Sequence, residues 1–305
     1  MRFGAFVMTF RRPEHLRRTL HTLLAQTRPP DMILVVDNAG DAQTCAVTQD
    51  FPANRVSYAP QADNRGPAGG AAYGLQTLGA VGYDWIYWGD DDDPPLTEDT
   101  LARLTAIAEH AADTPEVAVV SAVGHLFDWQ RGVIVRRDDA ALTGILDIDV
   151  FAGGTHPIVR GDTVRTVGVP DPALFFGFEE AEYSLRLRRQ GYRLLVDGEL
   201  MRQYREQTGR LGYKRPMVAA LPAEIQQIWR QYYTTRNYIY CMVHRFGRPD
   251  LARRQTLRAL AKSNLGWQKG LAYGRVYQAM HLRGLWDGWR GRMGRTVMPQ
   301  AKYGE

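Results

Sequence analysis

The sequence predicts an α/β fold with a mostly parallel sheet, followed by a helical C-terminal region. Two apolar runs, residues 3–9 and 32–36, flank an amphipathic stretch that begins at Pro13 and ends near Gln26. Strand, helix and strand in this order indicate a βαβ unit, in which the two strands are parallel neighbours in one sheet. From about Ala223 onward strand patterns no longer occur, and helical patterns remain.

The other elements are expected in chain order from their apolar runs and helical spacing. We expect further strands at 56–58, 85–88, 117–121 and 192–196, and further helices at 64–78, 97–111 and 179–191. Thr97 is expected to cap the N-terminus of its helix. Residues 122–150 indicate a hairpin region, and residues 151–169 combine strand and turn character. Two prolines on either side of residue 220 divide the chain into residues 1–220 and 221–305.

The composition is that of a globular protein without a disulfide framework. Of the 305 residues 45% are hydrophobic and 23% are charged, which suits a chain with a sizeable core. The two cysteines, Cys45 and Cys241, are far apart in sequence, and we expect each to be a reduced core residue. The N-terminal residues run directly into a strand, and no stretch approaches the roughly 20 apolar residues that span a bilayer. We therefore expect a soluble or peripheral protein in the cytoplasm.

The net charge of +5 conceals opposite charges in the two parts of the chain. Residues 225–305 contain 15 Lys or Arg and 3 Asp or Glu, a net charge of +12, whereas residues 1–224 carry a net charge of −7. A basic tail of this kind suits an anionic partner, which is a membrane surface, a nucleic acid or an acidic polymer.

Four consecutive carboxylates, Asp90 to Asp93, follow the apolar run at residues 85–88. Ligands of open α/β sheets bind at the carboxyl ends of strands, and hard divalent cations prefer oxygen ligands such as carboxylates. In an extended segment Asp90 and Asp92 project to the same side, so these two are candidates to share one ion. A solvated acidic loop that caps the next helix is the alternative.

Two further segments have patterns that suit a ligand site. Residues 64–70 are rich in glycine and precede a helix, so their backbone can approach a phosphate at the helix N-terminus. The alternative there is a tight turn. Glu179 and Glu180 begin a helix directly after three phenylalanines, and apolar neighbours raise the pKa of a carboxyl group toward that of a working general base. The alternative is that these acids only favour the N-terminus of their helix.

Taken in order, these landmarks resemble the inverting family-two glycosyltransferases, and among them the bacterial galactofuranosyl- and rhamnosyltransferases. The resemblance covers residues 3 to about 240 and rests on five segments, which are residues 7–13, 35–39, 64–70, 90–93 and 175–186. It implies that residues 1–220 form a catalytic domain with the GT-A fold, a nucleotide-binding α/β fold. Residues 221–305 are then a helical extension.

The resemblance implies transfer of a sugar from a nucleotide-diphosphate donor to a hydroxyl of a glycan or lipid-linked acceptor. Glu180 is the implied general base, with Glu179 beside it, and Mn²⁺ or Mg²⁺ on Asp90 and Asp92 stabilises the leaving diphosphate. The implied nucleotide contacts are Thr9, Arg11, Asp37, Asn64, Gly66, Asp90 and Asp91. The implied acceptor contacts are Trp88, Gly154, His156 and Phe178.

Two features depart from the family's pattern. The acid pair is more often Glu-Asp or Asp-Asp, so Glu180 is one methylene longer than usual. The His that often completes the family's metal site is missing, and Gln203 stands near its position. His156 is nearer the substrate on this interpretation, and the alternative is that it is a turn residue. The third metal ligand therefore stays open.

The basic tail resembles the family in its first part only. Residues 225–247 contain a Tyr-Tyr-x-x-Arg-Asn pattern similar to the family's helix after the catalytic domain, and its aromatic stripe suits docking onto the core. Further along, basic residues accompany Trp267, Trp286 and Trp289, which is typical of helices that lie on anionic lipids. We expect peripheral binding to the inner face of the plasma membrane. No nucleic-acid reader motif is present, so we expect no nucleic-acid partner.

Three functions stay open. The first is an active transferase, with UDP favoured over dTDP because the pattern is closest to the galactofuranosyl members; a rhamnosyltransferase that uses dTDP-rhamnose is its variant. The second is a catalytically silent nucleotide-sugar-binding protein of the same fold. A nucleotidyltransferase ranks last, because residues 9–13 lack the glycine of a phosphate-binding loop.

Overall fold

The computed structural model describes residues 1–151, 156–213 and 221–298. The chain divides into two compact units. The first, here called the sheet unit, consists of Met1–Asp128, Val133–Asp171 and Glu180–Tyr213. The second, the helical unit, consists of Trp129–Gly132, Pro172–Glu179 and the chain from Lys214 onward. The division of the chain at residue 220 stays a prediction. The helical unit also includes two short segments from earlier in the chain, Trp129–Gly132 and Pro172–Glu179.

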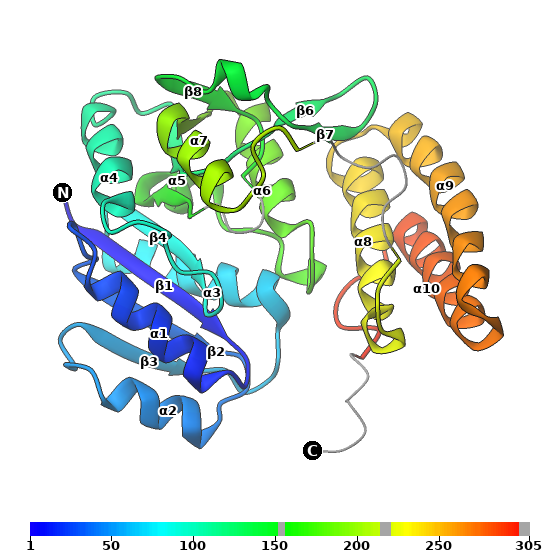
Figure 1. Cartoon of the computed structure of the whole chain (residues 1–305), viewed down its shortest axis with the longest axis horizontal. Coiled ribbons are helices and arrows are strands. Elements are labelled where there is room, and N and C mark those ends of the chain that lie inside the picture. The colour runs from blue at the N-terminus through cyan, green and yellow to red at the C-terminus, as the bar shows by residue number, and fades with distance from the viewer. Residues whose placement is uncertain (152–155, 214–220, 299–305) are drawn as a thin grey trace. The chain divides into compact units, whose positions relative to one another are not determined.

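An eight-stranded sheet with the order β3-β2-β1-β4-β9-β5-β10-β8 forms the centre of the sheet unit (Figure 1). Its strands are β1 (Phe3–Thr9), β2 (Met32–Asp37), β3 (Val56–Pro60), β4 (Trp85–Asp90), β5 (Val117–Ser121), β8 (Ile145–Ile148), β9 (Ile158–Arg160) and β10 (Arg193–Asp197). Strands β3, β2, β1 and β4 are mutually parallel, as are β5 and β10, whereas β9 and β8 are antiparallel to their neighbours. The α/β class and the mostly parallel sheet are confirmed.

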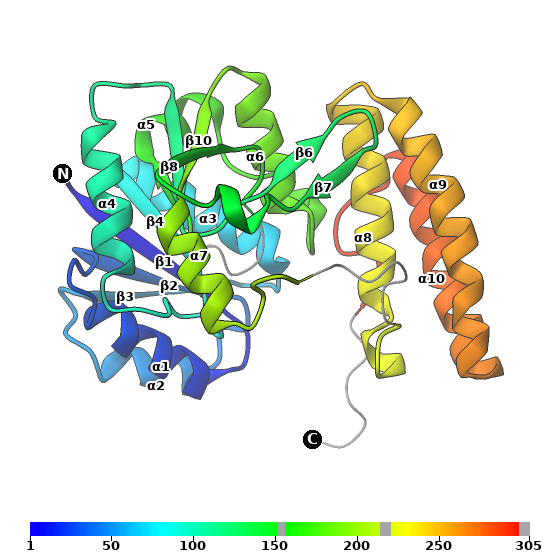
Figure 2. The same ribbon diagram turned by 45° about the horizontal axis from the view of Figure 1, so that its top comes forward.

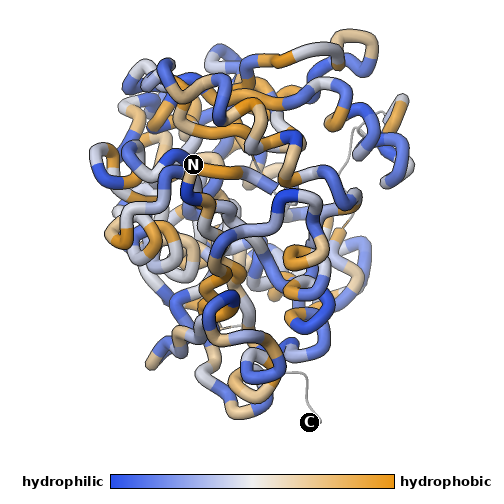
Figure 3. Tube along the Cα trace, turned by 90° about the vertical axis from the view of Figure 1, so that its left-hand side faces the viewer, coloured by the Kyte–Doolittle hydropathy of each residue, from blue (hydrophilic) through white to orange (hydrophobic). Residues whose placement is uncertain are grey.

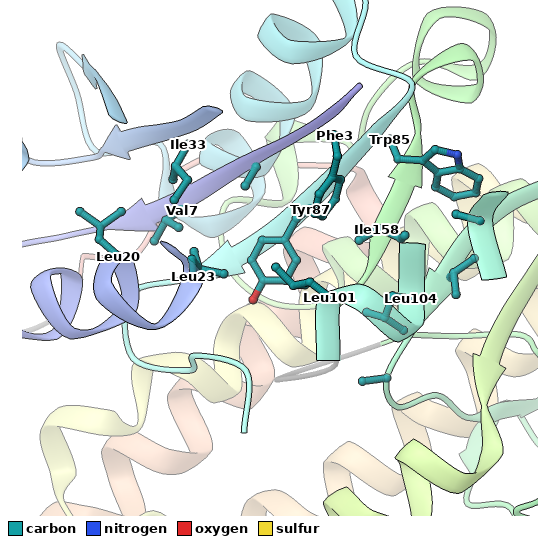
Figure 4. Packing of buried hydrophobic residues seen from close by; sticks show 14 of the residues in the cluster. Phe3, Val7, Leu20, Leu23, Ile33, Trp85, Tyr87, Leu101, Leu104 and Ile158 are labelled. Carbon is teal, nitrogen blue, oxygen red and sulfur yellow. The ribbon is translucent and has the colours of Figure 1, made fainter. Parts of the chain in front are cut away.

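Side chains of β1 alternate between two hydrophobic cores, because successive residues of a strand face opposite sides. Phe3 and Val7 belong to one core and Phe6 and Met8 to the other. The first core packs on helices α1 (Pro13–Leu24) and α4 (Thr100–His110), and the second on α3 (Gly66–Val81) and α6 (Glu179–Arg189). Figure 4 shows the first core, with Leu20 and Leu23 of α1 and Leu101 and Leu104 of α4 turned toward the strands. In Figure 3 the strand that follows the N-terminus is correspondingly hydrophobic.

The parallel register brings the functional candidates to one edge of the sheet. Thr9 is aligned with Asp37 across β1 and β2, and Met8 is aligned with Asp90 across β1 and β4. Because parallel strands end at the same edge, the residues that follow β1, β2 and β4 lie close together. This edge carries most of the candidate site.

Several short elements were not predicted from the sequence. They are the helices α2 (Ala42–Gln49), α5 (Gly161–Val167) and α7 (Gly198–Gln207). The side chains of Asp41 and Asp197 cap α2 and α7 by accepting hydrogen bonds from backbone N–H groups. The predicted cap at Thr97 is wrong, because α4 begins at Thr100 and the Thr97 hydroxyl instead pairs with the Thr100 hydroxyl at 2.8 Å. The predicted hairpin region contains the antiparallel pair β6 (Leu126–Asp128) and β7 (Val133–Val135).

Helices α8 (Trp229–Tyr240), α9 (Pro249–Ser263) and α10 (Leu271–Arg290) make up most of the helical unit, side by side in Figures 1 and 2. Glycines allow α10 to approach α8 closely: a Cβ on Gly284 would lie 2.7 Å from the Tyr232 carbonyl oxygen, and one on Gly288 would lie 2.8 Å from that of Arg236. A π-helical turn, Cys241–Arg245, follows α8, and short 3-10 turns occupy Asp139–Ala141, Pro172–Leu174, Ile225–Gln227 and Asn264–Lys269.

Within the described residues no helix is both long enough and apolar enough to cross a bilayer. Both cysteines are free thiols; Cys241 is a buried core residue as expected, whereas Cys45 is only partly buried.

We expect Gly161→Ala to destabilise the sheet unit by about 2 kcal/mol or more, because an added methyl group would overpack a site that the backbone cannot vacate. A Cβ at residue 161 would lie 2.0 Å from the carbonyl oxygen of Tyr83. Gly70→Ala is the matched control, since its nearest neighbour is the flexible Sδ of Met8 at 2.9 Å. Urea unfolding followed by tryptophan fluorescence measures both variants. Equal midpoints for the two variants would contradict this packing argument.

Candidate functional site

A pocket with an empty volume of about 270 Å³ opens where β4 ends. It contains three carboxylates, from Asp90, Asp93 and Glu180. Its other lining residues are Tyr87, Trp88, Gly89, His156 and Pro157. The sequence therefore predicted four of these side chains as site residues, but not Asp93 or Tyr87. All belong to the sheet unit.

The carboxylates of this pocket interact unfavourably when all are ionised. Although solvent reaches Asp90 through the pocket, the surrounding protein desolvates its carboxyl group and, together with the negative charges of Glu180 and Asp92, raises its pKa to about 8. Desolvation and Asp92 also raise the pKa of Asp93. A pocket of this kind favours a proton or a cation.

Asp91 does not line the pocket, and its hydrogen bonds stabilise the surrounding structure. It is buried, and its carboxylate accepts hydrogen bonds from the Thr9 hydroxyl at 2.7 Å and from the Arg12 guanidinium at 3.3 Å. Desolvation raises the pKa of Asp91, while these two donors act in the opposite direction. The Thr19 hydroxyl also donates to the Asp91 carbonyl oxygen at 2.7 Å. These bonds fix the acidic run to β1 and α1.

Asp92 forms a salt bridge with Arg12 and is about half exposed. Arg12 thus contacts two of the four consecutive carboxylates and offsets part of their repulsion. The sequence did not single out Arg12 as a functional residue. Arg12 follows the end of β1 by three residues. Only the folded structure shows that it lies beside the acidic run, because the two segments are far apart in the sequence.

His156 is buried in the wall of the pocket with a backbone φ of 49°. Its Nδ1 shares a hydrogen bond of 2.9 Å with the Tyr87 hydroxyl, and its Nε2 has no hydrogen-bond partner. Desolvation lowers the pKa of His156 to about 4, so the imidazole is neutral at pH 7. A neutral imidazole nitrogen in a pocket that carboxylates also line is a donor type that fits a divalent cation.

Among the described residues, no three His, Cys, Asp or Glu side chains already converge as a complete metal site. The donor chemistry of Asp90 and of the partner-free His156 Nε2 fits a divalent cation. Gln203, on α7, is half-buried and does not line the pocket.

The end of β2 forms a hydrogen-bonded turn around Asp37. Its carboxylate accepts from the backbone N–H groups of Ala39 at 2.8 Å and Asp41 at 3.1 Å, and from the Tyr58 hydroxyl at 2.8 Å. The neighbouring Asn38 is buried, and its side-chain Oδ1 has no partner. Asn38 is therefore a further candidate for ligand contact, which the sequence placed only as a neighbour of Asp37.

The glycine-rich segment turns sharply into α3. The Asn64 side chain accepts a hydrogen bond of 2.8 Å from the Gly66 N–H, and Gly66 has a φ of 68° that suits glycine. The Asn38 amide donates to the Gly66 carbonyl oxygen at 3.3 Å, which joins this turn to the end of β2. Arg11, after β1, is exposed, and its φ is 55°.

The acid pair stands at the start of α6. Glu180 lines the pocket and is half-buried, and Glu179 is buried. Phe178 does not line the pocket; within the helical unit its ring packs on Tyr238 with centroids 5.5 Å apart. Gly154 lies outside the described residues. The roles predicted for all these residues stay predictions.

Residues 5–148 match the model of glycosyl transferase family 2. This part of the chain is similar to a family-two glycosyltransferase domain. Galactofuranosyltransferase GlfT1 of Mycobacterium tuberculosis is 34% identical over 197 residues, which cover 61% of this chain and 64% of that relative. The GlfT1 of Mycolicibacterium smegmatis is likewise 34% identical, over 61% of this chain and 65% of its own length. The resemblance noted in the sequence is confirmed, and the matched part spans less than two thirds of these relatives.

Solved structures confirm the GT-A fold. The mannosyltransferase PcManGT from Pyrobaculum calidifontis, in complex with GDP-Man and Mn²⁺, has a TM-score of 0.51 at 17% identity and covers 95% of this chain and 87% of its own. GalNAc-T7 with UDP, GalNAc and Mn²⁺ has a TM-score of 0.57 at 14% identity, over 92% of this chain and 54% of its own. At these identities the likeness concerns the fold alone.

We expect Thr9→Val to destabilise the protein by about 1.5–3 kcal/mol, because the buried Asp91 carboxylate then loses one of its two side-chain donors. Thr9→Ser keeps the hydroxyl and is expected to retain most of the stability. Thr22→Val is the control, since that exposed hydroxyl bonds only within its own helix. Urea unfolding compares the three variants. If Thr9→Val is as stable as the wild type, the hydrogen bond from Arg12 alone is enough to compensate the buried Asp91 carboxylate.

Proposed function

We propose that this protein is a metal-dependent inverting glycosyltransferase, which moves a sugar from a nucleotide-diphosphate donor to a hydroxyl of a glycan or lipid-linked acceptor. The observation that carries the proposal is the pocket shared by Glu180 and Asp90 at the carboxyl end of β4. One carboxylate suits proton removal, and the other suits the binding of a cation beside a leaving diphosphate. The family-two domain and the galactofuranosyltransferase relatives support the proposal.

The proposed donor is a UDP-sugar, with UDP-galactofuranose as the first candidate. Two galactofuranosyltransferases are among the relatives, and TarS of S. aureus, with a TM-score of 0.51 and 13% identity, was solved with UDP. The proposed nucleotide contacts lie on the edge where β1, β2 and α3 meet, at Thr9, Arg11, Asp37, Asn64 and Gly66. Asp90 and Asp91 complete this set.

In the proposed reaction Glu180 accepts the proton of the acceptor hydroxyl. The acceptor oxygen forms a bond with the anomeric carbon, while the bond from that carbon to the diphosphate breaks on the opposite face and its electron pair stays on the diphosphate. Asp90 and Asp92 are the proposed holders of Mn²⁺ or Mg²⁺, which when bound supplies charge stabilisation for the leaving group. Trp88 and His156 are proposed to contact the acceptor from the pocket wall. The acceptor contacts of Phe178 and Gly154 stay predictions from the resemblance alone.

We expect Glu180→Gln to lower turnover by at least about 100-fold, because general-base catalysis contributes this much or more. Turnover is measured as UDP release from UDP-galactofuranose with octyl galactofuranoside as acceptor. The thermal shift on adding UDP with Mn²⁺ should stay as in the wild type, since ligand binding to the native state is unchanged. Glu14→Gln, at an exposed acid on α1, is the control.

Near-normal turnover of Glu180→Gln would rule out Glu180 as the base. A wild-type protein that binds UDP with Mn²⁺ but turns over no donor would instead favour a silent binding protein of this fold.

We also propose that the helical unit binds the anionic inner face of the plasma membrane. The outer stripe of α10 alternates apolar and basic side chains at helical spacing: Leu271, Arg275, Leu282, Trp286 and Arg290, all exposed. Trp286 and Leu271 are 59% and 61% exposed. The Arg290 guanidinium lies over the Trp286 ring at 3.8 Å. Apolar and basic groups on one face are typical of interfacial helices.

We expect the protein to float with phosphatidylglycerol-containing vesicles at low salt and to sink at high salt. Replacing Trp286 and Leu282 with Ala should weaken vesicle binding by roughly 10-fold or more, since each buried large apolar side chain contributes about 1.5–3 kcal/mol. Val81→Ala, at an exposed apolar residue of the sheet unit, is the control. A wild-type protein that stays in the dense fraction at low salt would refute membrane binding.

A further inference from the structure

Three arginines of the sheet unit, Arg136, Arg205 and Arg210, are here called the arginine cluster. Arg136 follows β7 directly, Arg205 is on α7, and Arg210 comes three residues after the end of that helix. Arg136 donates hydrogen bonds to the Asp139 carboxylate at 2.5 Å and to the Arg210 carbonyl oxygen at 2.8 Å. Arg205 donates to the same oxygen of Asp139, its Oδ1. Two guanidinium groups therefore converge on one carboxylate oxygen.

The arginine cluster carries more positive charge than the carboxylates beside it offset. Asp139 is in direct contact with two of its members, and the exposed Asp138 acts on Arg205 through its charge. The adjacent Arg202 is paired with Glu206 at 3.4 Å and leaves the balance unchanged. Three guanidinium groups thus face two carboxylates, and a net positive charge remains.

Two buried nitrogen atoms at this cluster make no hydrogen bond within the described part of the chain. They are Nη2 of Arg205, whose side chain is 4% exposed, and Nδ1 of His125. Desolvation, together with the positive charges of the three arginines, lowers the pKa of His125 to about 4, so its imidazole is neutral at pH 7. A buried guanidinium N–H without an acceptor is unfavourable, and the net positive charge favours an anionic acceptor.

The arginine cluster is open to solvent on one side. Arg210 is exposed and the Arg136 side chain is 28% exposed, whereas Arg205 is buried behind them. A ligand can therefore approach the first two from solvent and meet the charge of the third. Phosphate suits this arrangement better than a carboxylate does, because it offers more acceptor oxygens and more negative charge to several guanidinium forks.

The arginine cluster and the proposed nucleotide contacts lie toward opposite ends of the sheet. In the strand order β2 and β1 stand on one side of β4, where the pocket opens, and β10, which leads into α7, stands on the other. Arg205 is next in sequence to Tyr204, whose ring meets that of His156 in the pocket wall at 5.4 Å. The charge of Arg210 also reaches the pocket, where it acts to lower the pKa of Asp93 against desolvation.

We propose that Arg136, Arg205 and Arg210 form a phosphate-binding site that is separate from the donor site. Its ligand is an acceptor that carries a phosphate or diphosphate group, as one does in which this group joins a glycan to a lipid. The phosphate is held by the arginine cluster while the sugar of the acceptor reaches the pocket. The inference rests on the proposed function, because it concerns the acceptor of that reaction.

The first test measures binding of inorganic pyrophosphate by isothermal titration calorimetry. EDTA is present, so that no divalent cation holds the ligand at the carboxylates of the pocket. We expect Arg136→Gln to weaken binding by about tenfold or more, since a charge-assisted hydrogen bond to phosphate contributes about this much. Arg165→Gln is the matched control: Arg165 also pairs with an aspartate three residues away and donates to a backbone carbonyl group, but it is on α5.

A wild-type protein that does not bind pyrophosphate would overturn the proposal, as would equal weakening in Arg136→Gln and Arg165→Gln. This measurement needs no turnover, so it separates failure of this inference from failure of the proposed function. Selective loss of pyrophosphate binding in Arg136→Gln, together with a wild type that turns over no donor, would refute the glycosyltransferase proposal and support the phosphate site.

Two further measurements distinguish an acceptor phosphate from the diphosphate of the donor. Arg136→Gln should keep the Kd for UDP with Mn²⁺ within about twofold, because the native state binds that ligand elsewhere. Geranyl diphosphate should inhibit transfer to octyl galactofuranoside in competition with this acceptor, and its inhibition constant should rise about tenfold in Arg136→Gln. Weakened UDP binding in Arg136→Gln, or inhibition that competes with UDP-galactofuranose instead, would assign the arginine cluster to the donor and overturn the proposal.

Discussion

Repulsion among the carboxylates at the end of β4 is the constraint on which the arrangement of the sheet unit depends. Four consecutive aspartates cannot all face the same pocket without a large unfavourable interaction. The fold separates them: Asp91 is turned inward to Thr9, Asp92 pairs with Arg12, and Asp90 and Asp93 remain in the pocket. The raised pKa of Asp90, caused by desolvation and by neighbouring carboxylates, shows that the repulsion is only partly offset. What remains is a local preference for positive charge, which is the property that a diphosphate-binding site with a divalent cation requires.

The sequence predicted the parts of this arrangement that depend on local pattern. The strands from β1 to β5, the helices α1, α3 and α6, and the acidic run followed from apolar periodicity and from the order of the landmarks. The helices α2 and α7 escaped prediction because they are short and begin at aspartate caps rather than at an apolar stripe. Asp93, Tyr87 and Arg12 were not predicted as site residues, because their role depends on the direction in which each side chain points in the fold. No linear pattern distinguishes an aspartate that enters the pocket from one that anchors the turn.

The contacts of the three phenylalanines before α6 also could not be predicted from the sequence. In the sequence they suggest an apolar wall for the neighbouring acids. In the structure their rings pack on aromatic side chains of α8, since left-handed residues at 175, 177 and 178 turn the chain there. Glu180 instead shares its pocket with a polar side chain, Asp90. The negative charge of Glu180 contributes to the raised pKa of Asp90. Burial and like charges together raise the pKa of Asp90, with burial as the larger cause.

This repulsion has a structural consequence for α6. Two carboxylates that share a pocket push each other apart, so attraction between them cannot hold Glu180 in place. A cation in the pocket would attract both carboxylates, but only while it is bound. Helix α6 is held instead by apolar packing within the sheet unit, where its residues Tyr183 and Leu187 are buried in the core. Because these contacts are apolar, their strength does not change when the carboxylates gain or lose a proton or an ion.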